Sequence, residues 1–240
     1  MYPHLITDNT ITIFADGTTV SITKDSPTFG SVLAAIKSED WDGAIALASP
    51  KAMVSAYTSG HMDIVNGVLT RNGKEIDHAM VPHILKLHAD GFNVEPLIAF
   101  LDKVLMNPSM RSRNQIWRFV SFNNITITPE GDLLFYKKVT DTYFDVHTGK
   151  TNCYRPGTTH TMPREMVDDD PESTCSVGLH VCSHEYLKKF GGSRTVVCKV
   201  NPRDIVSVPI DYNNTKVRVC ELYVVSETAD PTPMQTSISF

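Results

Sequence analysis

The chain has 240 residues, of which 41% are hydrophobic and 20% are charged, and its formal net charge at neutral pH is -5. This composition is typical of a globular protein with a sizeable core, and it excludes a wholly disordered chain and a surface that is basic throughout. The longest apolar runs, such as residues 97–101, fall far short of the roughly 18 residues that span a bilayer. No basic and apolar leader begins the chain, so we expect a cytoplasmic protein whose five cysteines are thiols.

The first part of the sequence predicts short strands and helices. ITIFADGTTVSI has two β-rich arms around Asp16-Gly17, which is typical of a hairpin. Three short helices with capping residues before them are expected next, in FGSVLAAIKSE, where Thr28 is the N-cap, WDGAIALA and SPKAMVSAYTSG. Asn66-Gly67 and Asn72-Gly73 then indicate two turns of a three-stranded meander over residues 61–76.

The central region has the apolar period of helices. DHAMVPHILKLHADG is an amphipathic stretch that Gly91 ends, and residues 93–105 place their apolar side chains along one helix face, with Asn93 as the N-cap. After Asn107-Pro108, Ser109 is expected to cap a further helix, MRSRNQIWRFVSF.

After residue 124 the pattern changes to strands, in LLFYKKV, RTVVCKV, IVSVPI and KVRVCELYVVS. The predicted fold class is therefore α+β, with an α-rich N-terminal half that carries a small β-hairpin and a meander. The C-terminal half is expected to be β-rich, with a mixed or antiparallel sheet. The domains that follow are an α-rich region over residues 1–124, a β-rich domain over residues 125–227 and a flexible tail over residues 228–240.

The segment TCSVGLHVCSHEY places Cys175, His180, Cys182 and His184 within ten positions. Residues 177–182 fit a strand with both faces covered, and Ser183 is expected to cap a short helix in HEYLKKF. His180 and Cys182 lie on the same strand face, which allows them to share one ion. Together with Cys175 and His184 they are the candidate zinc ligands, although the spacing of the four matches no standard zinc motif.

Two other interpretations of this segment stay open. Cys175 or Cys182 with His180 as its base is a candidate nucleophile, which requires that burial does not keep the thiol protonated. We favour the third interpretation, a buried strand with small sulfur-containing core residues. The sequence identifies no catalytic residue.

Further charged residues are candidates for binding. Arg111, Arg113 and Arg118 have helical spacing near Trp117 and could follow a phosphate backbone, but an exposed helix face is the more common explanation. The remaining candidate binding residues are Asp204, Asp211, Lys216 and Arg218. For the last three we favour a turn with a local ion pair.

Several blocks recur in the order typical of one family, namely NPSMRSRNQIWRF, ITPEGDLLFYKKV, MPREMVDDDPESTCSVGLHVCSHEYL and VNPRDIVSVPIDYNNTKVRVCELYVV. On these blocks, over residues 93–225, the chain resembles the rIIB-like family of bacteriophage proteins. The positions that match the family motif are Cys175, Gly178, Leu179, His180, Cys182, Pro202, Asp204, Pro209, Asp211, Lys216 and Arg218.

The resemblance implies an early phage protein that works with a rIIA-like partner in the host cytoplasm. It implies roles in lysis inhibition and in overcoming exclusion by a resident prophage. Any association with the inner face of the membrane is then expected to be indirect, through the partner. We favour a non-enzymatic protein with no cofactor, against two alternatives: a metal- or thiol-dependent enzyme using Cys175, His180 and Cys182, and an anti-defence module that binds nucleic acid or a ligand.

Overall fold

The computed structural model describes residues 2–15, 18–24, 26, 28–49, 52, 58, 61–65, 68–89, 92, 94–210 and 215–229. The chain divides into two compact units, Met1–Asp102 and Lys103–Phe240. Several expected features lie outside the described residues: the Asp16-Gly17 and Asn66-Gly67 turns, most of SPKAMVSAYTSG, the Gly91 and Asn93 helix ends, and the tail beyond residue 229.

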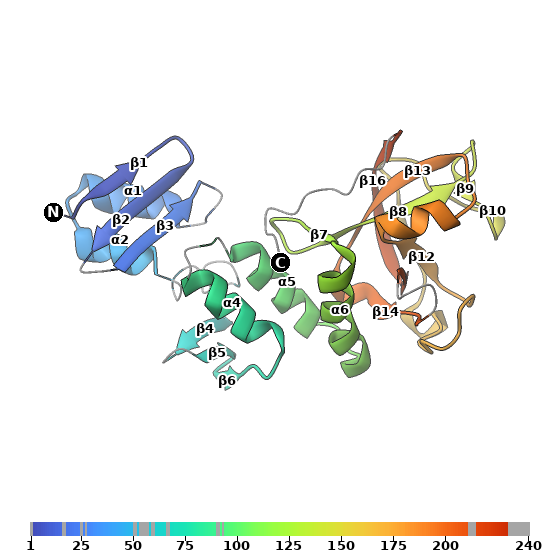
Figure 1. Cartoon of the computed structure of the whole chain (residues 1–240), viewed down its shortest axis with the longest axis horizontal. Coiled ribbons are helices and arrows are strands. Elements are labelled where there is room, and N and C mark those ends of the chain that lie inside the picture. Colours follow the sequence, from blue (N-terminus) through green and yellow to red (C-terminus); the bar gives the residue numbers. More distant parts are fainter. Residues whose placement is uncertain are drawn as a thin grey trace. The chain divides into compact units, whose positions relative to one another are not determined.

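The first unit begins with an antiparallel sheet in the order β1 (His4–Ile6), β2 (Thr10–Ala15), β3 (Thr18–Thr23). Alternate residues of the strands, Ile11, Ile13 and Ile22, are buried because one sheet face packs against helices. These helices are α1 (Phe29–Lys37) and α2 (Trp41–Leu47), which appear in blue beside the sheet in Figure 1. Asp40 caps α2 by accepting a hydrogen bond from the backbone N–H of Gly43.

A second antiparallel sheet follows, formed by β4 (Met62–Val65), β5 (Val68–Arg71) and β6 (Lys74–Glu75), and then α4 (Met80–Ala89) and α5 (Glu95–Leu105). The turn between β5 and β6 is the expected one. Asn72 and Gly73 have φ angles of 51° and 75°, which suit a tight hairpin turn because asparagine and glycine tolerate left-handed backbone best.

The expectation of an α-rich N-terminal half is wrong. In the described residues up to Asp102, two three-stranded sheets stand beside the helices. The strand that sequence analysis missed is β1, whose residues are all exposed and therefore show no apolar alternation.

The second unit starts within α5 and continues with α6 (Met110–Asn123). Ser109 caps α6 as predicted, by accepting a hydrogen bond from the N–H of Ser112. The helix buries Ile116, Phe119 and Val120 on one face. Asn124, at the expected domain boundary, is the left-handed residue that ends the helix, with a φ of 49°.

The described residues of the second unit form a ten-stranded sheet in which every pairing is antiparallel. Its main path runs β11-β16-β13-β8-β12-β15-β14; off this path, β7 and β9 pair with β8, and β10 pairs with β9. The strands are β7 (Thr126–Ile127), β8 (Leu133–Val139), β9 (Phe144–Asp145), β10 (Gly149–Cys153), β11 (Thr159–Thr161), β12 (Leu179–Cys182), β13 (Arg194–Val200), β14 (Ile205–Ser207), β15 (Lys216–Val219) and β16 (Glu221–Thr228).

Three 3-10 helices connect these strands in the described part of the unit: η1 (Arg164–Met166), η2 (His184–Lys189) and η3 (Pro202–Asp204). The short helix expected after Cys182 is η2. Ser183 precedes it, but the expected capping hydrogen bond is absent, and the buried hydroxyl of Ser183 has no hydrogen-bond partner among the described residues. No described helix of the chain is both long and apolar enough to cross a membrane.

Candidate functional site

Within the segment that contains the candidate ligands, Gly178 lies just before β12. The φ of Gly178 is +154°, and a Cβ at this position would lie 3.0 Å from Val167 Cγ1 and 3.2 Å from Arg218 Cδ. Glycine is therefore required here by both the backbone conformation and the close approach of neighbouring side chains.

Strand β12 lies between β8 and β15, and this position decides which side chains meet. His180 is opposite Arg218, and Cys182 is opposite both Lys216 and Tyr136. Residues directly opposite one another share a sheet face, so the candidate metal and binding residues of these strands lie on one face. On that face, Cys182 packs into a cluster with Tyr136, Tyr186 and other apolar side chains.

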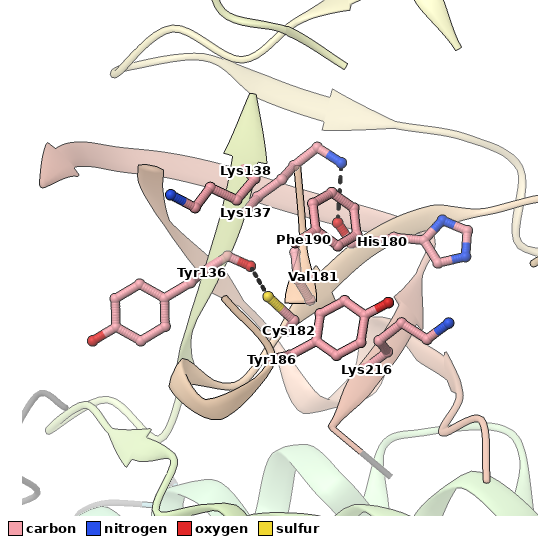
Figure 2. A pocket seen from close by; sticks show the side chains of 9 residues that line it. All are labelled: Tyr136, Lys137, Lys138, His180, Val181, Cys182, Tyr186, Phe190 and Lys216. Carbon is pink, nitrogen blue, oxygen red and sulfur yellow. Dashed lines mark hydrogen bonds between the residues drawn. The ribbon is translucent and has the colours of Figure 1, made fainter. Parts of the chain in front are cut away.

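The Cys182 thiol is a buried hydrogen-bond donor. Its Sγ donates to the carbonyl oxygen of Tyr136 at 3.3 Å (Figure 2). Burial raises the pKa of Cys182 to about 12, although nearby lysine charges oppose the shift. The thiol is therefore protonated at neutral pH, which is unfavourable for a nucleophile or a metal ligand.

His180 is also held in its neutral form. Burial, and then the charges of Lys137, Arg218 and Lys216, lower its pKa to about 4, against a smaller opposite effect of Asp145. In Figure 2 the ring of His180 points away from the Cys182 sulfur, although both residues belong to one strand face. The two side chains do not form a nucleophile and base pair.

The other two predicted zinc ligands, Cys175 and His184, have different surroundings from His180 and Cys182. Cys175 is exposed, before the strand begins. The ring of His184 packs edge-on against Tyr136, with the ring centroids 5.9 Å apart. Within the described ranges, no three His, Cys, Asp or Glu side chains are grouped so that they could hold a metal ion.

A buried ion pair that sequence analysis missed lies beneath this segment. The Lys137 ammonium group is 2.7 Å from Asp145 Oδ2, donates to the carbonyl oxygen of His180 at 3.2 Å, and lies 4.5 Å from the ring centroid of Tyr154. Burial acts to raise the pKa of Asp145, but its interactions with Lys137 and two backbone N–H groups outweigh this effect and lower it to about 2.

The signal for this pair was present in LLFYKKV. Lys137 lies two or four residues from Leu133, Phe135 and Val139, so its side chain shares the apolar face of β8 with theirs. A lysine at an inward strand position requires a buried counter-charge, but the sequence did not show that Asp145 would supply it.

Arg218 and Lys216, predicted as binding residues in an exposed turn, are instead buried and hold a loop to the sheet. The Arg218 guanidinium donates to the carbonyl oxygens of Asp168 at 2.8 Å, Ser173 at 2.7 Å and Asp170, and to Ser207 Oγ at 3.1 Å. Lys216 donates from Nζ to the carbonyl oxygen of Thr174 at 3.0 Å. Both cations therefore fix the backbone of residues 168–174.

The two remaining candidate binding residues of this group are Asp204 and Asp211. Asp204 is buried, and its carboxylate accepts from Arg203 at 2.9 Å and 3.1 Å. Its backbone carbonyl accepts from the thiol of Cys220 at 3.4 Å. Asp211 lies outside the described residues.

The three arginines of α6 have different surroundings. Arg111 donates to the carbonyl oxygen of Asp169 at 3.2 Å, and Arg113 donates from Nε to the carbonyl oxygen of Asn107. Arg118 is exposed on the helix. Two of the three guanidinium groups thus already bind backbone of this chain, which leaves a weaker phosphate-binding surface than the spacing suggested.

A small pocket opens where β8, β12 and β15 meet η2, as Figure 2 shows. It encloses about 210 Å³, including space that is open to solvent. Its lining consists of Tyr136, Lys137, Lys138, His180, Val181, Cys182, Tyr186, Phe190 and Lys216. Its small size, together with the protonated thiol of Cys182, favours a structural role for the segment.

Comparisons with known proteins agree with the resemblance seen in the sequence blocks. A family model described as bacteriophage T4 protein rIIB matches residues 4–237. Protein rIIB of Enterobacteria phage T4 is 37% identical over 223 residues, which cover 92% of this chain and 71% of the T4 protein. No solved structure matches the chain significantly. The chain therefore belongs to the rIIB family of bacteriophage proteins.

Proposed function

We propose that this chain is a rIIB-like accessory protein that protects a phage infection from exclusion by a resident prophage and influences the timing of lysis. It acts through protein partners, above all a rIIA-like phage protein, in the host cytoplasm. Any contact with the inner face of the membrane is made through that partner.

The observation that carries this proposal is the relationship to T4 protein rIIB. The 37% identity extends over 92% of the chain, so it includes both compact units and is not confined to one motif. Similarity of this extent favours a shared role for the whole chain.

The chemistry of the segment around β12 gives no support to the alternative of a thiol-dependent enzyme. Burial keeps the thiols of Cys182 and Cys198 protonated, with pKa values raised to about 12. Arg218 is fully buried and its guanidinium donates to backbone carbonyls and a serine hydroxyl. These groups stabilise the fold, so they give no support to a thiol-dependent reaction.

Complementation tests the proposal. A phage that lacks its own rIIB gene is plated on a host with and without the excluding prophage, while this chain is supplied from a plasmid. We expect the chain to restore plaques on the prophage-bearing host, provided that the phage's own rIIA-like protein is present. The proposal is contradicted if the folded, expressed chain fails while the phage's own rIIB gene, supplied in the same way, succeeds.

A further inference from the structure

Among the described residues, no strand pairs with the outer edge of β1, so its backbone groups are available there. Thr7 donates from its backbone N–H to the carbonyl oxygen of Thr10 at 2.9 Å, and Phe14 donates to the carbonyl oxygen of Pro3 at 2.9 Å. The backbone groups of β1 therefore alternate so that Leu5 pairs with β2, while the N–H and C=O groups of His4 and Ile6 point to the open edge.

Apolar side chains surround this edge on both faces of the sheet. Leu5 is 57% exposed and Phe14 is 47% exposed. Leu5 is opposite Thr12, two residues before Phe14, so the two apolar side chains are neighbours on the face away from the helices. Ile6 is opposite Ile11 on the helix-covered face, yet it remains 41% exposed because it lies at the edge.

The edge carries no charged side chain, and its protection is limited to the shortness of β1 and to Pro3 before it. The run YPHLIT, residues 2–7, contains no Asp, Glu, Lys or Arg. Edge strands of monomeric proteins commonly carry lysine or other charges that prevent pairing with another chain. The opposite edge strand, β3, exposes the polar side chains of Thr19 and Ser21, whereas β1 exposes the apolar side chains of Leu5 and Ile6.

We propose that β1 pairs with β1 of a second copy of this chain, in an antiparallel, two-fold symmetric arrangement. His4 and Ile6 then exchange backbone hydrogen bonds with Ile6 and His4 of the partner subunit, and the register places Leu5 opposite the partner's Leu5. Leu5 occupies the position where opposing side chains approach most closely, and Phe14 extends the apolar contact.

This pairing joins the two β1-β2-β3 sheets into one and covers Leu5, Ile6 and Phe14. An uncharged edge that is apolar at its centre is complementary to itself, which favours a second copy over a charged partner strand. Because β1 has only three residues, the interface is small, and the association is of the weak class with a dissociation constant of about a micromolar or higher. The pairing involves no rIIA-like protein and does not depend on the proposed function.

Analytical ultracentrifugation of the full chain over a wide concentration range tests the proposal. The wild type should convert from monomer to dimer as concentration rises, and Leu5→Lys should weaken the dimer about 10-fold or more, because like charges would face each other. Thr19→Lys adds the same charge to the same sheet face on the opposite edge strand and should leave the dissociation constant unchanged. An equimolar mixture of Leu5→Lys and Leu5→Glu chains should associate again.

If Leu5→Lys fails to fold, Ile6→Pro replaces it. The N–H of Ile6 faces the open edge, so proline there removes a donor from the new ladder without removing one from the pairing with β2. A wild type that stays monomeric throughout overturns the proposal. So does a dimer that Leu5→Lys and Thr19→Lys affect equally.

Discussion

The Lys137 ammonium group lies 2.7 Å from Asp145 Oδ2, and the two side chains are only 2% and 14% exposed. The pair connects β8 to β9, and Lys137 also binds the backbone of His180 in β12. A single buried cation thus links three strands of the large sheet.

Removing one partner of this pair should destabilise the protein strongly. Lys137→Met leaves the Asp145 carboxylate without its buried counter-charge, so we expect the free energy of unfolding to fall by about 3–5 kcal/mol. Urea denaturation measures the change. The matched control is Glu227→Gln in the solvent-exposed pair with Arg194, which should reduce the free energy of unfolding far less. Equal losses in both variants would contradict the account.

His180 should make stability depend on pH in the mildly acidic range. Its folded-state pKa is lowered to about 4, whereas an unfolded histidine titrates near 6.5. The unfolded chain therefore binds more protons between these values. The contribution of neutral His180 is fully present above about pH 6.5 and is lost as the pH falls towards 4.

A His180→Gln variant should show a flatter dependence of unfolding free energy on pH across this window. In the wild type, the ring proton resonances in NMR spectra should not begin to shift until the pH is well below 6. A ring that titrates at its ordinary value in the folded protein would show that burial and the neighbouring charges do not lower the pKa of His180.

Arg218 should control the order of the loop over residues 168–174. Arg218→Lys keeps the charge but loses the planar arrangement of donors that binds three carbonyl groups and Ser207, so we expect a loss of about 3 kcal/mol. Limited proteolysis within the loop should become faster. Arg111→Lys is the control, since Arg111 also binds this loop but is exposed, and similar cleavage rates for the two variants would refute this role.

The cysteines should differ in reactivity. Cys175 is exposed and should react with a thiol reagent in the native protein, whereas Cys182 and Cys198 should react only on unfolding because burial raises their pKa values to about 12. Mass spectrometry of labelled peptides measures the reactivity of each thiol. Elemental analysis of protein purified without chelator measures its metal content. Stoichiometric zinc that protects Cys175 would restore the metal interpretation.

Sequence periodicity predicted the elements in which one face is apolar. Ser109 and the helix after it were predicted because capping and apolar spacing agree there, and β12 was predicted from the alternation of Leu179 and Val181. KVRVCELYVVS was expected to be one strand, but Cys220 separates β15 from β16. Strands β1, β9 and β11 have no buried residue, so their pairing comes from long-range contacts that no local pattern shows.

The candidate site was predicted less well than the fold elements. The sequence brought Cys175, His180, Cys182 and His184 together by spacing alone, but exposure, burial and ring direction separate them in the structure. The buried partners Lys137 and Asp145 come from different strands, and Arg218 binds a loop about 50 residues away in the chain, as its bond to Asp168 shows. Contacts between distant segments decide these roles, and one sequence does not show them.

We propose that this rIIB family member works through a rIIA-like partner, and co-purification of the two proteins tests this proposal. The chain and the rIIA-like protein of the same phage are expressed together, captured through a tag on either one, and compared with an unrelated phage protein of similar size. The account predicts a complex that survives size-exclusion chromatography with either protein tagged. Two folded proteins that elute separately, and that show no binding by calorimetry at high concentration, would contradict it.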